Sequence, residues 1–135
     1  PVFSFLSAQE GGHTLVFVEA NPLLEEPLRQ NVARLFPNAS ETQVVSAAVC
    51  ENSFGSVPFY RLSAAFFESH PELKALSQMS SLDRTWIQQC QGMFPQINLT
   101  EGWEEVPVRC LSPAELLAEV GLKPQDVDAI TVHVE

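Results

Sequence analysis

Glu19 and Asn21 are the first residues of the chain whose types and positions suggest chemistry. Glu19 follows a run of apolar and β-branched residues at positions 14–18, and Asn21 opens the Asn-Pro pair after it. A carboxylate at the end of a buried strand can accept hydrogen bonds from the vicinal hydroxyls of a ribose, as it does in dinucleotide-binding proteins. The same carboxylate could instead cap the next helix or be solvated in a loop, and both interpretations remain open.

The other potentially reactive side chains form no recognisable site. Cys50, Cys90 and Cys110 are separated by long, unequal gaps, which fit neither a disulfide framework nor a paired zinc motif, so we expect buried free thiols. No two cysteines or histidines share helical or turn spacing, and we therefore expect no metal site. Asn-x-Ser/Thr triplets begin at Asn38 and Asn98, and these matter only if the protein is secreted.

The composition argues against several classes of function. With 135 residues, 45% of them hydrophobic, the chain can build one core, and we expect one domain or part of one. Acidic residues outnumber basic residues by 17 to 7, and the net charge of −10 argues against nucleic acid or anionic lipid as a partner. No apolar run approaches the roughly 20 residues that span a bilayer. No signal-peptide layout is visible, which favours the cytoplasm without fixing the compartment.

A predicted strand, helix and strand would position Glu19 and Asn21. Residues 14–18 form a continuous apolar run, typical of a strand that is covered on both faces. Asn21 is a favourable N-cap and Pro22 a favourable first helical residue, and residues 42–49 form the next strand. The short joints between these elements indicate a βαβ unit with parallel strands.

The helix after Asn21 carries an apolar stripe that would pack on the sheet. The stripe consists of Leu24, Leu28, Val32 and Leu35. Pro27 removes one backbone donor, so it would shift the start of the regular helix to about Glu25 or kink the helix. Residues 2–8 are interpreted as the end of an earlier helix, with a strand as the competing interpretation.

A long insertion interrupts the alternation of strands and helices. Residues 56–61 are expected to form an edge strand, because Pro58 is tolerated at an edge. Residues 62–105 contain scattered glycine and proline, and we expect a helical insertion over the sheet with short helices near 73–76 and 82–91.

The last part of the chain returns to regular elements. Residues 106–111 are predicted to form a strand, and Ser112 and Glu115 have the spacing of a helical capping box. Residues 129–134 are predicted to form a further buried strand that ends at Glu135. The whole pattern predicts an α/β fold, with an open, mostly parallel sheet and flanking helices, in which ligands bind outside the carboxyl ends of the strands.

Four segments together resemble the FkbM-type family of S-adenosylmethionine-dependent methyltransferases. They are V-F-V-E-A-N-P at 16–22, V-V-S-A-A-V at 44–49, V-R-C-L-S-P-A-E-L-L at 108–117 and D-V-D-A-I-T-V-H-V-E at 126–135. Their order and spacing match the family's F-E-P-N-P, its alanine-valine strand end, its V-x-T-L-D-x-L-L helix and its D-x-L-K-I-D-V-E-G strand. The resemblance covers most of the chain apart from the insertion, and it implies a partial Rossmann-like fold of the class I methyltransferase type.

The resemblance implies a binding site for S-adenosylmethionine. Glu19 would hold the ribose hydroxyls, and Asn21 would support the turn beside it. Ala48 and Val49, at the end of the next strand, would flank the adenine, where small and apolar side chains let a flat ring lie close.

The resemblance also implies where the methyl group is transferred. Glu135 matches the family's glutamate near the methyl acceptor, which is expected to be a hydroxyl of a small molecule or a glycan. The family's Lys-Ile-Asp is replaced here by Thr131, Val132 and His133. His133 could act as a general base near neutral pH, or it could be a buried structural histidine.

Two departures from the family keep other functions open. The family's first strand and glycine-rich turn have no counterpart, so we expect residues 1–135 to be part of one larger methyltransferase-like domain. Because of the changes at Thr131 and His133, an inactive methyltransferase-like module that binds a partner is the first alternative. Another nucleotide-dependent α/β enzyme, such as a dehydrogenase, is the second.

Overall fold

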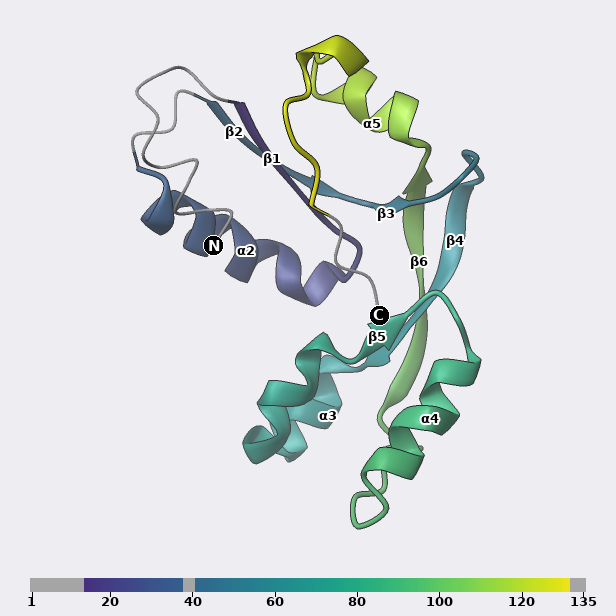
Figure 1. Ribbon diagram of the computed structural model, residues 1–135. Coiled ribbons are helices and arrows are strands. Elements are labelled where there is room, and N and C mark those ends of the chain that lie inside the picture. Colours follow the sequence, from purple (N-terminus) through teal and green to yellow (C-terminus); the bar gives the residue numbers. More distant parts are fainter. Residues whose placement is uncertain (1–13, 38–40, 132–135) are drawn as a thin grey trace.

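The computed structural model describes residues 14–37 and 41–131 (Figure 1). The helix end predicted at 2–8 lies outside the described residues, as do His133 and Glu135. In the described part, no helix is long and apolar enough to cross a bilayer.

The predicted strand-helix-strand unit is present. Strand β1 spans Thr14–Glu19, helix α2 spans Pro22–Leu35 and strand β2 spans Glu41–Ser46. The two strands run parallel, with Thr14 opposite Glu41 at one end and Glu19 opposite Ser46 at the other. Glu19 therefore stands at the carboxyl end of a parallel pair, as the sequence predicted.

Helix α2 begins where its cap predicts, and Pro27 does not delay it. The Asn21 side chain accepts a hydrogen bond from the Leu23 amide, and Pro22 is the first helical residue. The expected start near Glu25 is wrong, because Pro27 lies inside the helix and forgoes only its own backbone bond. In the apolar stripe Val32 is buried, whereas Leu35 is 58% exposed, so the packed face ends before the helix does.

A second sheet has the strand order β3-β6-β4-β5. Its strands are β3 (Ala48–Val49), β4 (Gly55–Leu62), β5 (Ser80–Ser81) and β6 (Trp103–Leu111). Strand β3 is parallel to β6, whereas β4 is antiparallel to both β6 and β5. The α/β class is therefore confirmed, but the described strands form a parallel pair and a mixed sheet rather than one mostly parallel sheet.

Two strand predictions are wrong because strand β6 pairs with both segments, β3 on one side and β4 on the other. The strand expected at 42–49 is split at Ala47, because its last residues leave β2 and pair with β6. The strand expected at an edge, β4, lies between β6 and β5. Pro58 is tolerated there because it faces Pro107 across the β4–β6 pair, where neither residue has an N–H to donate.

The insertion forms a subdomain with its own core. It contains helix α3 (Ala64–Ser69), the 3-10 helix η1 (Pro71–Gln78) and helix α4 (Thr85–Met93), which gather around one end of β4 and β6 rather than over the sheet (Figure 1). Its buried residues are Leu62, Phe66, Cys90 and Leu99. A side chain at Gly102 would collide with the Phe66 ring, so glycine is required at this close approach.

The chain after β6 follows the prediction only as far as its helix. Helix α5 (Pro113–Glu119) starts with the predicted capping box of Ser112 and Glu115. The 3-10 helix η2 (Pro124–Asp126) follows. The strand predicted from residue 129 is wrong for its described part, because residues 129–131 have no regular structure and Ile130 is 75% exposed. Among the described strands none pairs with these residues, and a strand needs such a neighbour.

Candidate functional site

Glu19 lies at the carboxyl edge of sheet β1–β2 and is half-buried. Its backbone carbonyl accepts a hydrogen bond of 3.1 Å from the Ala47 amide, which holds the end of β1 against the end of β2. One carboxylate oxygen, Oε1, accepts a 2.7 Å hydrogen bond from the Asn21 amide. The N-cap of helix α2 is Asn21, so this bond braces the turn before the helix rather than capping the helix. Among the described residues, no donor makes a hydrogen bond to the other oxygen, Oε2.

Asn21 is buried, at 1% exposure, and its side chain joins three segments. Its Oδ1 accepts from the Leu23 amide at 3.1 Å and from Arg61 Nη1 at 3.3 Å. Its Nδ2 donates to the Ser77 carbonyl at 3.1 Å. Asn21 therefore fixes the turn between β1 and α2 against strand β4 and helix η1. This geometry agrees with its predicted role of supporting the turn beside Glu19.

Arg61 is the residue of this region that the sequence did not single out. Its side chain is only 12% exposed, and its Nε donates a 2.9 Å hydrogen bond to Glu104 Oε1. The two residues are opposite each other in the β4–β6 pair. The sequence offered one indication of this role, which is that Arg61 is the one charged residue of strand β4. That indication does not predict that Glu104 and Asn21 are its partners.

Ala48 and Val49 differ in how they face their surroundings. Ala48 is 4% exposed and packs with Phe59 and Val108, in a cluster that also includes Ala20. Ala20, in the turn that follows Glu19, packs against this cluster as a whole. Val49 is 49% exposed, so its side chain faces out beside this cluster.

The two predicted catalytic residues, His133 and Glu135, lie outside the described residues and remain predictions. Among the described residues no group of histidine, cysteine or acidic side chains is arranged to hold a metal ion. A hollow of about 190 Å³ lies between α2 and β2, and its lining residues do not include Glu19 or Asn21.

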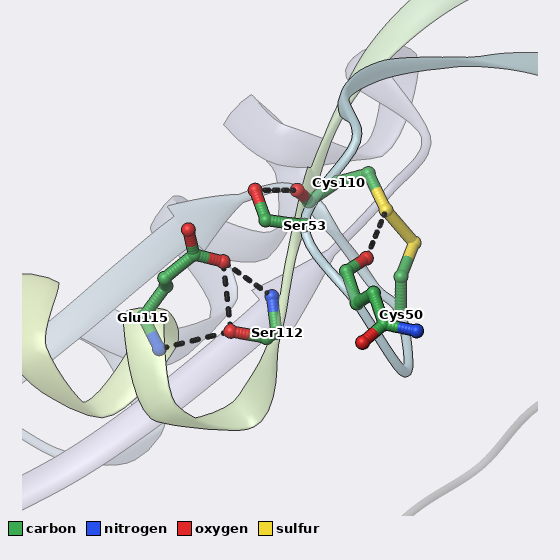
Figure 2. The surroundings of a disulfide bond; sticks show 6 residues. Cys50, Ser53, Cys110, Ser112 and Glu115 are labelled. Carbon is green, nitrogen blue, oxygen red and sulfur yellow. Dashed lines mark hydrogen bonds between the residues drawn. A yellow bond between two sulfur atoms is a disulfide. The ribbon is translucent and has the colours of Figure 1, made fainter.

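A disulfide joins the ends of β3 and β6, which corrects the expectation of three free thiols (Figure 2). Cys50 and Cys110 are bonded with their Cα atoms 5.8 Å apart, whereas Cys90 is a buried thiol outside any disulfide. The Cys50 amide also donates to the Leu111 carbonyl, so both backbone and side chain fix this strand end. The 60-residue separation hides the pair in the sequence, because only the β3–β6 pairing brings the cysteines together.

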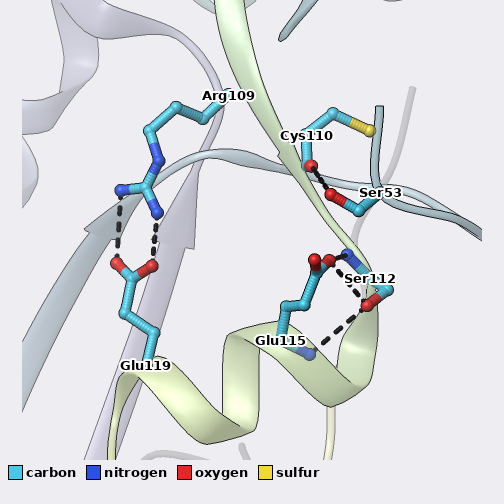
Figure 3. Close-up of polar contacts among 6 residues, drawn as sticks. All are labelled: Ser53, Arg109, Cys110, Ser112, Glu115 and Glu119. Atoms are coloured by element: carbon cyan, nitrogen blue, oxygen red, sulfur yellow. Dashed lines mark hydrogen bonds and ion pairs between the residues drawn. The ribbon is translucent and has the colours of Figure 1, made fainter. Parts of the chain in front are cut away.

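Polar contacts fix helix α5 beside the disulfide (Figure 3). The Ser112 amide and hydroxyl donate to Glu115, and these bonds hold the pKa of Glu115 below its ordinary value. Glu119, on the next turn of α5, forms an ion pair through two hydrogen bonds with Arg109 of strand β6. These groups are exposed, and we assign them to holding the helix in place rather than to a ligand.

Replacing Asn21 with alanine should lower the free energy of unfolding by about 2 kcal/mol. The variant loses the helix cap and leaves the Ser77 carbonyl and the Arg61 guanidinium short of a partner. Chemical unfolding of the full natural chain measures the change. Ser112→Ala is the matched control, because its capping bonds are exposed and its loss should be about 1 kcal/mol. Equal losses in the two variants would show that Asn21 does no more than cap its helix.

No protein-family model matches the chain, and neither does any curated protein or solved structure. The function is therefore argued from the site and from the four sequence segments described above.

Proposed function

We propose that the chain is part of an S-adenosylmethionine-dependent methyltransferase of the FkbM type. The acceptor we propose is a hydroxyl of a small molecule or a glycan. We further propose that the α/β fold is a partial Rossmann-like domain of the class I methyltransferase type. The observation that carries the proposal is the place of Glu19 at the carboxyl end of β1, beside the parallel strand β2.

The surroundings of Glu19 fit the ribose of an adenosyl group. A ribose offers two vicinal hydroxyls, and a carboxylate can accept a hydrogen bond from each. Oε1 of Glu19 accepts a hydrogen bond from the Asn21 amide and can accept one more. The second oxygen is available to a ligand. Because Asn21 is fixed by Ser77 and Arg61, the carboxylate is attached to a rigid turn. A preorganised acceptor of this kind loses little entropy when a ligand binds.

The end of β3 fits the adenine. Ala48 is small and buried, in a cluster against which Ala20 also packs, so it would lie beneath a flat ring without adding bulk. Val49 is half-exposed and offers an apolar side chain beside it. Burial of adenine against such a surface would contribute through the hydrophobic effect.

The proposed reaction needs no covalent intermediate with the protein. When bound, S-adenosylmethionine supplies a methyl group that its sulfonium already activates. The protein must align the acceptor oxygen with that group and remove the hydroxyl proton. We assign the proton to His133, because imidazole titrates near neutral pH, and the placement of the acceptor to Glu135.

The alternatives make different predictions about binding. An inactive module, suggested by Thr131 and His133 in place of the family's lysine and aspartate, could bind a partner without any cofactor. A dehydrogenase would use the same carboxylate for the ribose of a nicotinamide dinucleotide.

Titration calorimetry of the full natural chain tests the proposal. We expect a heat of binding with S-adenosylmethionine and with S-adenosylhomocysteine, and none with NAD. Binding of NAD alone would replace the methyltransferase by a dehydrogenase. Absence of heat with all three ligands would favour the inactive module.

A further inference from the structure

We propose that Asn98 carries an N-linked glycan and that the protein therefore resides in the secretory pathway or outside the cell. Two independent features support this: the disulfide between β3 and β6, and the geometry of the Asn98-Leu99-Thr100 triplet in the loop between α4 and β6. Neither feature depends on the proposed methyltransferase function.

The disulfide defines the compartment. Disulfides persist in oxidising environments such as the endoplasmic reticulum lumen and the cell exterior, and they are rare in the cytosol. Cys50 and Cys110 lie on neighbouring strands, and their Cα separation of 5.8 Å is within the usual range for a bonded pair. This pairing outweighs the lean toward the cytoplasm that the sequence suggested, because that lean rested on the lack of a visible signal peptide in residues that begin at Pro1.

The triplet presents its two recognition side chains to solvent. Asn98 and Thr100 are exposed, whereas Leu99 between them has 0% exposure and packs in the core of the insertion. The Leu99 amide donates a 2.8 Å hydrogen bond to Gln91 Oε1, which fixes the backbone of the loop. Since Leu99 points inward, its two neighbours are held on the surface, where a glycan can be accommodated.

The side-chain amide of Asn98 makes two local hydrogen bonds within its own exposed loop. Its Oδ1 accepts from the Thr100 amide at 3.2 Å, which forms a local turn. Its Nδ2 has a long contact of 3.4 Å with Glu101 Oε1, and both groups are exposed. A glycosylated Nδ2 keeps one hydrogen, so even this contact can survive the modification.

The transfer is balanced with a polyprenyl-diphosphate-linked oligosaccharide as donor. The Asn98 Nδ2 attacks the anomeric carbon of the first sugar and forms the new carbon–nitrogen bond. The bond between that carbon and the phosphate oxygen breaks, and the lipid diphosphate leaves with the electron pair. The amide nitrogen releases one proton.

A glycan at this position would leave the candidate cofactor site open. The loop between α4 and β6 is the lowest part of the molecule in the view of Figure 1, at the end of the insertion away from β1 and β2. Strand β1, which ends at Glu19, lies well away from this loop (Figure 1). Modification and cofactor binding can therefore be tested separately in the same preparation.

Expression of the full natural chain in cultured eukaryotic cells tests the proposal, with no added targeting sequence. The second triplet is removed with Asn38→Gln in every variant, so that any glycan reports on Asn98. We expect digestion with peptide N-glycosidase to increase the electrophoretic mobility of this protein. The shift should be lost in Asn98→Gln and in Thr100→Ala. It should be kept in Thr100→Ser, which preserves the triplet and is the matched control.

Peptide mass spectrometry of the same samples decides between the outcomes. Support requires that the Cys50 and Cys110 peptides are disulfide-linked and that enzymatic release of the glycan leaves aspartate at position 98. An unmodified Asn98 in protein with an intact disulfide would overturn the proposal, and so would reduced cysteines at positions 50 and 110. A mobility shift that persists in Thr100→Ala would assign the glycan to another residue and would also overturn it.

Discussion

Replacing Glu19 with glutamine should weaken the binding of S-adenosylmethionine about 100-fold, a loss of about 2.7 kcal/mol, while the folded state stays nearly unchanged. The glutamine oxygen can still accept the bond from the Asn21 amide that Glu19 Oε1 now accepts. What the variant removes is the second acceptor and the negative charge, and hydrogen bonds to charged groups contribute about 1.5–3 kcal/mol each. Calorimetry of the full natural chain gives the affinity, and chemical unfolding gives the stability.

The control for this variant is Glu68→Gln. Glu68 is an exposed glutamate on α3, so its replacement changes the net charge by the same amount without altering the end of β1. Glu19→Ala adds a second comparison, because it also removes the bond to the Asn21 amide and should lose stability as well as affinity. Unchanged affinity in Glu19→Gln would refute the assignment of this carboxylate to the ribose.

The elements that the sequence predicted correctly are those whose signals are local. Asn21 and Pro22 start α2, and Ser112 and Glu115 start α5, because a cap and the turn it closes are only three residues long. The parallel pair β1–β2 followed from short joints on either side of one helix. The capping groups are close along the chain, and the single helix with short joints between β1 and β2 limits how these two strands can be placed.

The elements that the sequence did not predict depend on distant partners. The strand breaks between β2 and β3 at Ala47, after which Ala48 pairs with Cys110 of β6, and nothing in the run of valine and alanine indicates this change of partner. The pairing of β4 with β6 joins segments on either side of the insertion. Alternation of side chains indicates a strand, but it does not indicate which strand lies beside it.

The candidate site shows the same division. Glu19 and Ala48 were predicted from the ends of two neighbouring strands, but the structure places Glu19 in the β1–β2 pair and Ala48 in the second sheet, where it pairs with β6. Arg61 and Ser77, which hold Asn21, were missed because both reach the turn from segments far along the chain. The assignments of His133 and Glu135 rest on the resemblance alone.

Removing the disulfide should cost about 4 kcal/mol of stability, the largest effect we expect from any change at a single contact. The bond closes a loop between residues 60 positions apart, and a closed loop of that length greatly restricts the unfolded chain. The entire insertion lies inside this loop. Reduction of the disulfide therefore removes the constraint on the whole insertion in the unfolded chain. Chemical unfolding of the full natural chain under oxidising conditions, compared with Cys50→Ala combined with Cys110→Ala, measures the difference.

Reductant distinguishes loss of the bond from loss of the side chains. Dithiothreitol should lower the unfolding midpoint of the natural chain to about that of the double variant, and it should leave the double variant unaffected. Cys90→Ala is the matched control, because Cys90 is a buried thiol that takes no part in the disulfide, and this variant should keep its sensitivity to reductant. If reductant has no effect on the natural chain, Cys50 and Cys110 are not bonded in solution. The inference that the protein belongs to an oxidising compartment would then lose its physical basis, whereas the role of Glu19 in binding the ribose would be unaffected.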